Sequence, residues 1–355
     1  SRGDGTGPST ASDNVGSFSM SNMNFDNVAA AFEHGSGGGT VVDIDSFSVN
    51  NGRKSCFNFA EDSVVTLTGT AGAPSTMTNC NTDGVWWGGA IVNVQDSTEG
   101  SLTMSYVDIT NSLVSGIKSD FKLIDIEHVN LIGNNYVYPI REYYGTYSSP
   151  GDANGIWDES SVYFQFNHKG IGSEVTIDNF NAVDSNGLST YHHGLICADT
   201  KLSLTNVNLG PGLGPAQDEY GNDHDDYLKI IPTCNSNAQG ASGANAVIDN
   251  LVVGNLEITS TQLSTFNNVD AKLVSFYGTP TSSDNTLITN GNMQMLKLSE
   301  DCGTNVELWN SVIESLASRC GDATGTNTVT MYDTNIVVND GYWFQYPPTL
   351  DPNAN

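Results

Sequence analysis

Two stretches of the chain bring together side chains that could bind a charged group or move a proton. The first, residues 133–172, is rich in tyrosine, and a Tyr-His-His sequence follows shortly after it. An arginine can pair with a carboxylate, and a tyrosine, histidine or lysine beside it can act as a general base. A packed aromatic loop is the alternative interpretation. The candidate residues are Arg141, Tyr143, Tyr144, His168, Lys169, Tyr191 and His192.

The second stretch, residues 210–243, contains a dense group of carboxylates in a glycine-rich context. Calcium is a hard cation that takes about six to eight oxygen ligands, so such a group predicts a Ca²⁺ site. The spacing differs from that of an EF-hand loop, and a solvated acidic loop is the alternative. The candidate ligands are Asp218, Glu219, Asp223, Asp225 and Asp226.

The six cysteines form three pairs of neighbours along the chain, separated by 24, 37 and 18 residues. Each separation is close to one unit of the repeat described below, with or without an inserted loop. Residues one unit apart would lie within reach of a disulfide, so three bridges are predicted. Six buried thiols in a reducing compartment are the alternative, and no spacing suggests a zinc site. The predicted pairs are Cys56 with Cys80, Cys197 with Cys234, and Cys302 with Cys320.

The two ends of the chain differ in character from the rest. Residues 1–14 are rich in Gly, Ser and Thr, which predicts a flexible segment. Residues 341–355 are apolar and contain prolines. We expect this tail either to cap the end of the fold or to insert into a neighbouring subunit, because aromatic side chains are common in interfaces. The interface candidates are Tyr342, Trp343, Phe344 and Tyr346.

All these residues need a scaffold, and a repeat indicates which one. Segments that start at Phe18, Val41 and Val64 begin 23 residues apart. Each alternates apolar and polar residues with period two and holds a polar corner, often Asn or Asp. Two short strands joined at such a corner would make one coil of a stacked solenoid. Further segments of this pattern start at Leu102, Leu123, Val175, Leu202 and Val329.

The repeat length and pattern resemble the right-handed parallel β-helix superfamily, often called pectate-lyase-like. The resemblance covers residues 15–340. It implies an all-β, single-stranded right-handed parallel β-helix of about 12 coils, with long loop insertions at residues 133–172 and 210–243. An antiparallel β-sandwich or jelly roll is the alternative fold. No linker-like composition interrupts the repeat, so we expect one elongated domain.

Families of this fold include polysaccharide lyases, which are similar in using Arg, Lys, Tyr or His to act on a uronate. Polygalacturonases of the same fold use paired aspartates. Fragments of their motifs occur here as Asn81-Thr-Asp83, His192-His-Gly194 and Asp225-Asp226, out of the family's order and without its Arg-Ile-Lys motif. We interpret these fragments as coincidence.

Charge and composition limit the partners of the chain. The formal net charge of −28 argues against binding to nucleic acids or anionic membranes. No apolar run reaches the roughly 18 residues of a membrane span. The chain starts with serine and shows no signal peptide, which we interpret as a mature chain whose export signal has been removed. With the predicted disulfides, this favours an extracellular or cell-surface location.

Glycosylation signals are absent although the chain has 39 asparagines, because no Asn-x-Ser/Thr sequence occurs. One interpretation is a surface that packs against other molecules. The leading hypothesis is therefore a structural, non-enzymatic protein that forms or decorates a filament, sheath, S-layer-like coat or adhesin. Its partners would be other copies of itself or cell-surface components. The alternatives are a secreted polysaccharide lyase or glycoside hydrolase, and a non-catalytic carbohydrate-binding module.

Overall fold

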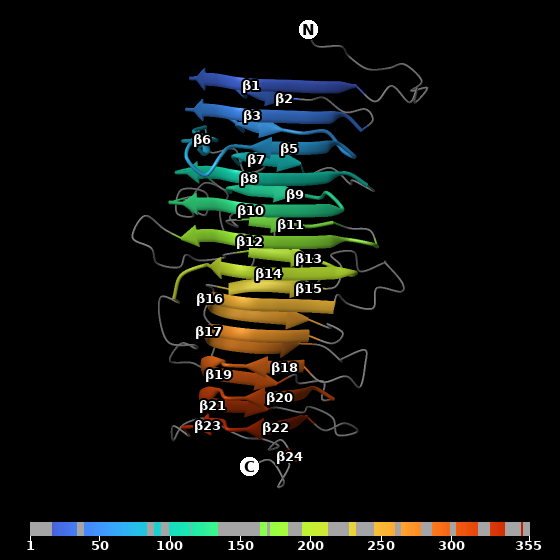
Figure 1. The fold of residues 1–355 in the computed structure, drawn as a ribbon, viewed down its shortest axis with the longest axis vertical. Helices are drawn as coiled ribbons and strands as arrows, with labels where there is room; N and C mark the ends of the chain where they lie inside the picture. Colours follow the sequence, from blue (N-terminus) through green and yellow to red (C-terminus); the bar gives the residue numbers. More distant parts are fainter. Residues whose placement is uncertain are drawn as a thin grey trace, which may run out of the picture.

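A stack of parallel strands runs the length of the molecule in the computed structural model (Figure 1). The described residues contain no helix, and their strands form one 24-stranded sheet. The structure describes residues 16–33, 39–83, 89–93, 99–113, 115–133, 164–168, 171–183, 194–211, 227–231, 245–259, 264–277, 286–298, 303–318, 327–337 and 349–350.

Each strand pairs with its equivalent one coil further along the chain. Strand β1 (Ser17–Asp26) pairs with β3 (Val41–Asn50), and β3 pairs in turn with β5 (Val64–Thr68). Twelve such steps lead from β1 to β24 (Thr349–Leu350). The predicted solenoid of stacked coils is confirmed, and the antiparallel sandwich is wrong for the described residues.

The coil has three faces. The first two are joined at a corner, and many strands run across both. The third is built from shorter strands. Strands of the first two faces include β6 (Ser75–Thr78), β8 (Ser101–Thr110), β10 (Leu123–Ile132), β12 (Glu174–Val183), β14 (Lys201–Asn208), β18 (Thr286–Thr289), β20 (Asn305–Trp309), β22 (Thr328–Tyr332) and β23 (Asn335–Ile336). Third-face strands are β2 (Phe32–Glu33), β4 (Phe57–Asn58), β7 (Ile91–Asn93), β9 (Ile117–Ser119), β11 (Phe164–Phe166), β13 (Gly194–Cys197) and β15 (Tyr227–Ile231). Four strands continue from the second face onto the third face: β16 (Asn245–Thr259), β17 (Ser264–Tyr277), β19 (Asn292–Leu298) and β21 (Val312–Ser318).

Alternate side chains of the first two faces point inward and stack into apolar columns. Ile44 of β3 pairs with Leu67 of β5, which pairs with Met104 of β8, and all three are at most 1% exposed. The polar residues between them point outward. The alternation seen in the sequence therefore separates the core from the surface, as a half-buried strand requires.

Asparagines occupy the corners because their side chains tolerate the left-handed backbone. Asn179, Asn206 and Asn250 stand at the corner between the first two faces in successive coils, with φ of 51°, 53° and 59°. At the far end of the second face, Asn27, Asn51 and Asn79 have φ of 53°, 56° and 53°. Asn and Asp adopt this conformation more readily than other non-glycine residues. The expectation that Asn marks the corners is confirmed.

The corner amides also hydrogen-bond from coil to coil. Asn79 Nδ2 donates to Asn51 Oδ1 at 3.1 Å, and Asn51 Nδ2 donates to Asp26 Oδ1 at 3.0 Å. At the other corner, Asn310 Nδ2 donates to Asn290 Oδ1 at 2.7 Å. These amide ladders tie neighbouring coils together outside the backbone sheet.

One of the predicted disulfides joins two neighbouring coils. Cys56 and Cys80 are bonded, with their Cα atoms 5.5 Å apart. Cys197 is also disulfide-bonded, and its predicted partner Cys234 lies outside the described residues. Both members of the third predicted pair, Cys302 and Cys320, lie outside them too. The prediction is confirmed for the first pair.

Two strands of the third face lie within ranges expected to be loops. Strand β11 falls inside residues 133–172, and β15 falls inside residues 210–243. Both continue the stack, since β11 pairs with β9 and β13, and β15 pairs with β13 and β16. The segments between these strands and their neighbours lie largely outside the described residues, as do residues 1–14 and most of the C-terminal tail. No helix in the described ranges has the length and hydropathy needed to cross a membrane.

Candidate functional site

The outward row of the third face is buried, which sets it apart from the outward rows of the first two faces. Val92, Lys118, Gln165 and Leu195 pair in this order across β7, β9, β11 and β13. Their exposed fractions are only 1%, 1%, 4% and 2%. Their inward neighbours, such as Ile117, belong to the main core, so this row lies on the other side of the sheet. We call these four residues the covered row.

Polar and charged groups continue beside the covered row, at the ends of β9 and β11. Asp120 and Asn167 are 5% and 7% exposed, and His168 is 1% exposed. Burial of a lysine and an aspartate is costly unless each is paired or hydrogen-bonded. Such clusters of buried titratable groups are more frequent at functional sites than in ordinary cores.

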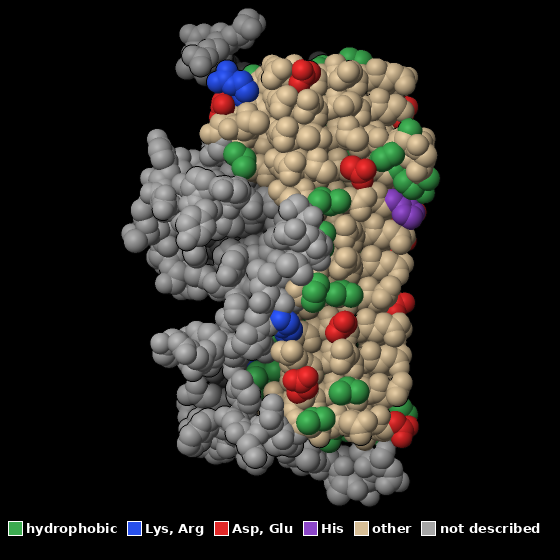
Figure 2. Space-filling model, turned by 90° about the vertical axis from the view of Figure 1, so that its left-hand side faces the viewer, with side chains coloured by type: hydrophobic (Ala, Val, Ile, Leu, Met, Phe, Trp, Pro, Cys, Tyr) green, Lys and Arg blue, Asp and Glu red, His purple; other side chains and the backbone are tan. Residues whose placement is uncertain are grey.

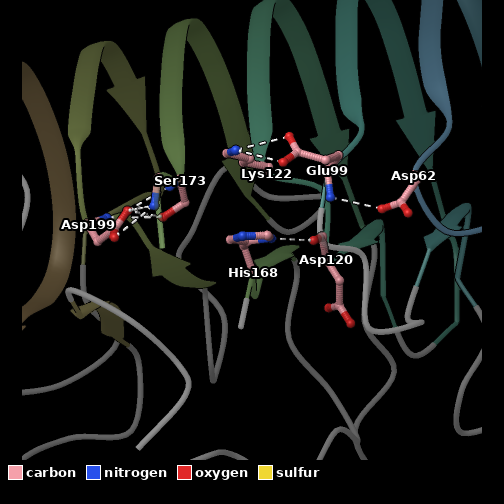
Figure 3. A network of polar contacts seen from close by, with 8 residues as sticks. Asp62, Glu99, Asp120, Lys122, His168, Ser173 and Asp199 are labelled. Carbon is pink, nitrogen blue, oxygen red and sulfur yellow. Dashed lines mark hydrogen bonds and ion pairs between the residues drawn. The ribbon is translucent and has the colours of Figure 1, made fainter. Parts of the chain in front are cut away.

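His168 holds the most specific chemistry of this region. Its Nδ1 lies 3.0 Å from the backbone oxygen of Asp120 (Figure 3), and a carbonyl can only accept, so Nδ1 carries the proton in this contact. Its Nε2 is buried and has no hydrogen-bond partner among the residues that the structure describes. A neutral imidazole in this tautomer presents an unshared electron pair at Nε2, the atom that a base or a metal ligand uses.

Asp199 organises the turn that leads from the third face back to the first. Its Oδ1 accepts from the backbone nitrogens of Gly172 and Ser173 at 2.8 and 2.6 Å. The hydroxyls of Ser173 and Thr200 donate to the same oxygen at 3.1 and 3.2 Å. Because this carboxylate is engaged with donors from two neighbouring turns, it acts as a structural clamp.

Lys122 and Glu99 form a second link in the same turn region, above His168 in Figure 3. Lys122 Nζ lies 3.1 and 3.0 Å from the two carboxylate oxygens of Glu99. The backbone nitrogen of Glu99 donates to Asp62 Oδ1 at 2.8 Å. The lysine side chain is 25% exposed and the glutamate 68%, so solvent weakens this ion pair.

The predicted catalytic residues fall almost entirely outside the described ranges. His168 is the exception, and the structure places its ring beside the backbone oxygen of Asp120. The other candidates, Arg141, Tyr143, Tyr144, Lys169, Tyr191 and His192, lie outside, as do the predicted Ca²⁺ ligands from Asp218 to Asp226 and the interface candidates from Tyr342 to Tyr346. Within the described part of the chain, no group of three His, Cys, Asp or Glu side chains could hold a metal ion.

A strained aromatic pair marks one corner of the rod. Tyr106 and His128 have φ of 53° in both cases, although bulky residues rarely adopt the left-handed region. Their rings stack at 4.5 Å. The exposed turn Thr70–Pro74 projects from the preceding coil, closed by hydrogen bonds between Thr70 and Ala73. Figure 2 shows hydrophobic side chains beside a histidine at its right-hand edge. Sequence reasoning missed this patch, because Tyr106 and His128 follow the ordinary rung pattern.

The first coil exposes side chains whose equivalents in the next coil are buried. Phe18 is 37% exposed, and Met20, Met23 and Phe25 are half-buried. Their equivalents in β3 are buried, between 0% and 3% exposed. In the described residues β1 pairs with β3 alone, so its other edge has no strand partner among them. We call Phe18, Met20, Met23 and Phe25 the N-terminal end surface.

Comparisons with models of known protein families, with curated proteins and with solved structures found no match.

Proposed function

We propose that this protein is a rigid extracellular rod that builds or decorates a cell-surface assembly through contacts between subunits. The N-terminal end surface carries the proposal. A soluble solenoid that ends on an unpaired strand edge and an open apolar column is prone to pair with another chain unless the end is covered. Full burial of a large apolar side chain contributes about 1.5–3 kcal/mol, so several half-exposed ones favour a partner.

The rest of the coil supports the role of a stiff spacer. Amide ladders at two corners and the Cys56–Cys80 disulfide join successive coils. A disulfide favours an oxidising compartment, which supports an extracellular location. We propose that the winding is right-handed, as nearly all crossovers between parallel strands are. Ca²⁺ at Asp218–Asp226 would bridge acidic loops and offset part of the net charge of −28.

The assembly is tested by the mass of the purified protein in solution. Light scattering over a wide concentration range, with and without millimolar Ca²⁺, should show growth beyond the monomer, and electron microscopy should show rods joined into larger objects. A chain that stays monomeric under every condition would remove the support for this function.

A carbohydrate-active enzyme is the second candidate, and the buried His168 favours it. A general base needs an unshared pair near its substrate, and Nε2 of His168 has no partner among the described residues. Arg141, Lys169 or His192 would then bind the uronate. Incubation with uronate polymers should release unsaturated products that absorb in the ultraviolet. The same assay on His168→Gln, which keeps a polar side chain, should show no product; equal rates would exclude His168 as the base.

A further inference from the structure

We infer that copies of this chain join head to tail, so that the C-terminal end of one solenoid meets the N-terminal end surface of the next. This inference rests on the proposed function and names the partner as a second copy. Three observations support it: the apolar columns at the two ends, the direction of the strands, and the distribution of charge.

Among the described residues, the inward columns end at both ends of the rod on side chains that are only partly buried. One column starts at Met20 of β1 and ends at Met331 of β22, and both are half-buried. Another starts at Phe25 and ends at Ile336, again half-buried at both ends. Residues between them, such as Val49 and Ile313, are 0% exposed. Head-to-tail stacking would extend each column and cover the half-buried residues at both ends.

The backbone favours the same arrangement. The strands at both ends of the rod pair in parallel with their neighbours and so run in the same direction. A second copy in line presents its last strands parallel to β1, so the ladder of parallel hydrogen bonds can continue. At the C-terminal end, β24 covers only Thr328 and Val329 of β22, and in the described residues β23 pairs with β21 alone. In a head-to-tail contact, the part of β1 on the second face, from Met23 to Asp26, would therefore lie opposite β23 of the other copy.

Charge separates the ends from the sides. The chain carries 40 acidic and 12 basic residues, and Figure 2 shows acidic side chains spread along one side with fewer basic ones. Side-by-side packing brings these carboxylates together, which is repulsive. The terminal strands are nearly neutral, because Asp26 is the single charged residue of β1 and neither β22 nor β23 has one. A heterologous contact of this kind does not close on itself and produces filaments.

Cysteine cross-linking tests the direction of the contact. Asn24 and Asn335 are exposed and stand in the same outward row at opposite ends of the rod. Full-length Asn24→Cys and Asn335→Cys proteins are mixed and treated with a short bismaleimide, whose reach spans one or two strand spacings of about 4.8 Å. We expect a cross-linked dimer in the mixture and not in Asn24→Cys alone. Asn208→Cys, exposed in the middle of the rod, replaces Asn335→Cys as the matched control and should give only background.

A pair of substitutions tests the apolar column. Met20→Glu should abolish assembly, whereas Ser19→Glu, one residue away on the outside, should preserve it. Melting curves of both variants check that the coil itself is intact.

The outcomes separate this inference from the proposed function. Assemblies that form without the Asn24–Asn335 cross-link would overturn the head-to-tail contact and leave the proposed function standing. Cross-linking of Asn24→Cys with itself would show a head-to-head contact, which also overturns the inference. A protein that remains monomeric would overturn both.

Discussion

Asn206 and Asn250 occupy equivalent left-handed corners of neighbouring coils, and Asn250 Nδ2 donates to Asn206 Oδ1 at 2.8 Å. Asn250 therefore has two roles. It accepts a backbone conformation that most residues resist, and it passes a hydrogen bond to the neighbouring coil. The first role is local, and the second makes the corner a side-chain extension of the sheet.

Replacement of Asn250 separates the two roles. Asn250→Ala removes the side-chain hydrogen bond to Asn206, which contributes about 0.5–1.5 kcal/mol. It also places alanine, which has no polar side chain, in the left-handed region, at a cost of about 1–2 kcal/mol. Asn250→Gly loses only this hydrogen bond, because glycine adopts a positive φ without strain. Urea unfolding should therefore rank the native chain above Asn250→Gly, and Asn250→Gly above Asn250→Ala. Equal midpoints for the two variants would show that the corner stores no strain.

Gly194 of β13 is a second position where a single methyl group decides stability. An added Cβ would overlap the ring of Phe164 in the neighbouring strand β11. Overpacking of this kind typically costs about 1–3 kcal/mol, so Gly194→Ala should lower the thermal midpoint by several degrees. Gly72→Ala is the matched control, because nothing lies within 4 Å of its Cβ position. If both variants melt with the native chain, the β11–β13 contact is looser than described.

Replacement of Asp199 should lower the stability of the turn that leads from the third face back to the first. Asp199→Ala leaves the buried nitrogen of Ser173 and the Ser173 hydroxyl without their acceptor. An unsatisfied buried donor costs about 1–3 kcal/mol, so we expect a loss of at least that size. Asp199→Asn keeps one acceptor oxygen and should retain part of the stability. Chemical denaturation measures both, and hydrogen exchange at Gly172 and Ser173 locates the effect.

The Cys56–Cys80 bond should stabilise the N-terminal coils specifically. It closes a loop of 24 residues, for which the loop-closure model gives about 3 kcal/mol. The double variant Cys56→Ala, Cys80→Ala should unfold at lower denaturant concentration, with hydrogen exchange faster in β3 to β7 first. Uniform acceleration along the whole rod would mean instead that the coils unfold as a single unit.

The sequence alone was sufficient to predict the strands of the first two faces but not those of the third. The alternation in Leu102-Thr-Met-Ser exists because one side of β8 meets the core and the other meets solvent. Strands β9 and β11 have only three residues each, all of them buried, so Ile117–Ser119 and Phe164–Phe166 are too short to show a period-two pattern. Without that signal, the range that contains β11 is predicted to be a loop.

The candidate site follows the same division. His168 was named from its residue type, but its contact with Asp120 crosses 48 residues and depends on the stacking of β9 and β11. Corners with asparagine were foreseeable, since Asn tolerates the left-handed region. The corner at Tyr106 was not, because its residue type argues against that conformation.

The stepwise pairing of equivalent strands makes length a modular property of this molecule. Each coil touches only its neighbours, so gain or loss of one coil would change the rod by a single strand spacing of about 4.8 Å and leave both ends unaltered. Duplication of a short stretch of the gene could thus lengthen the rod in fixed increments. In an assembly of such rods, the number of coils would act as a ruler that sets the distance between junctions.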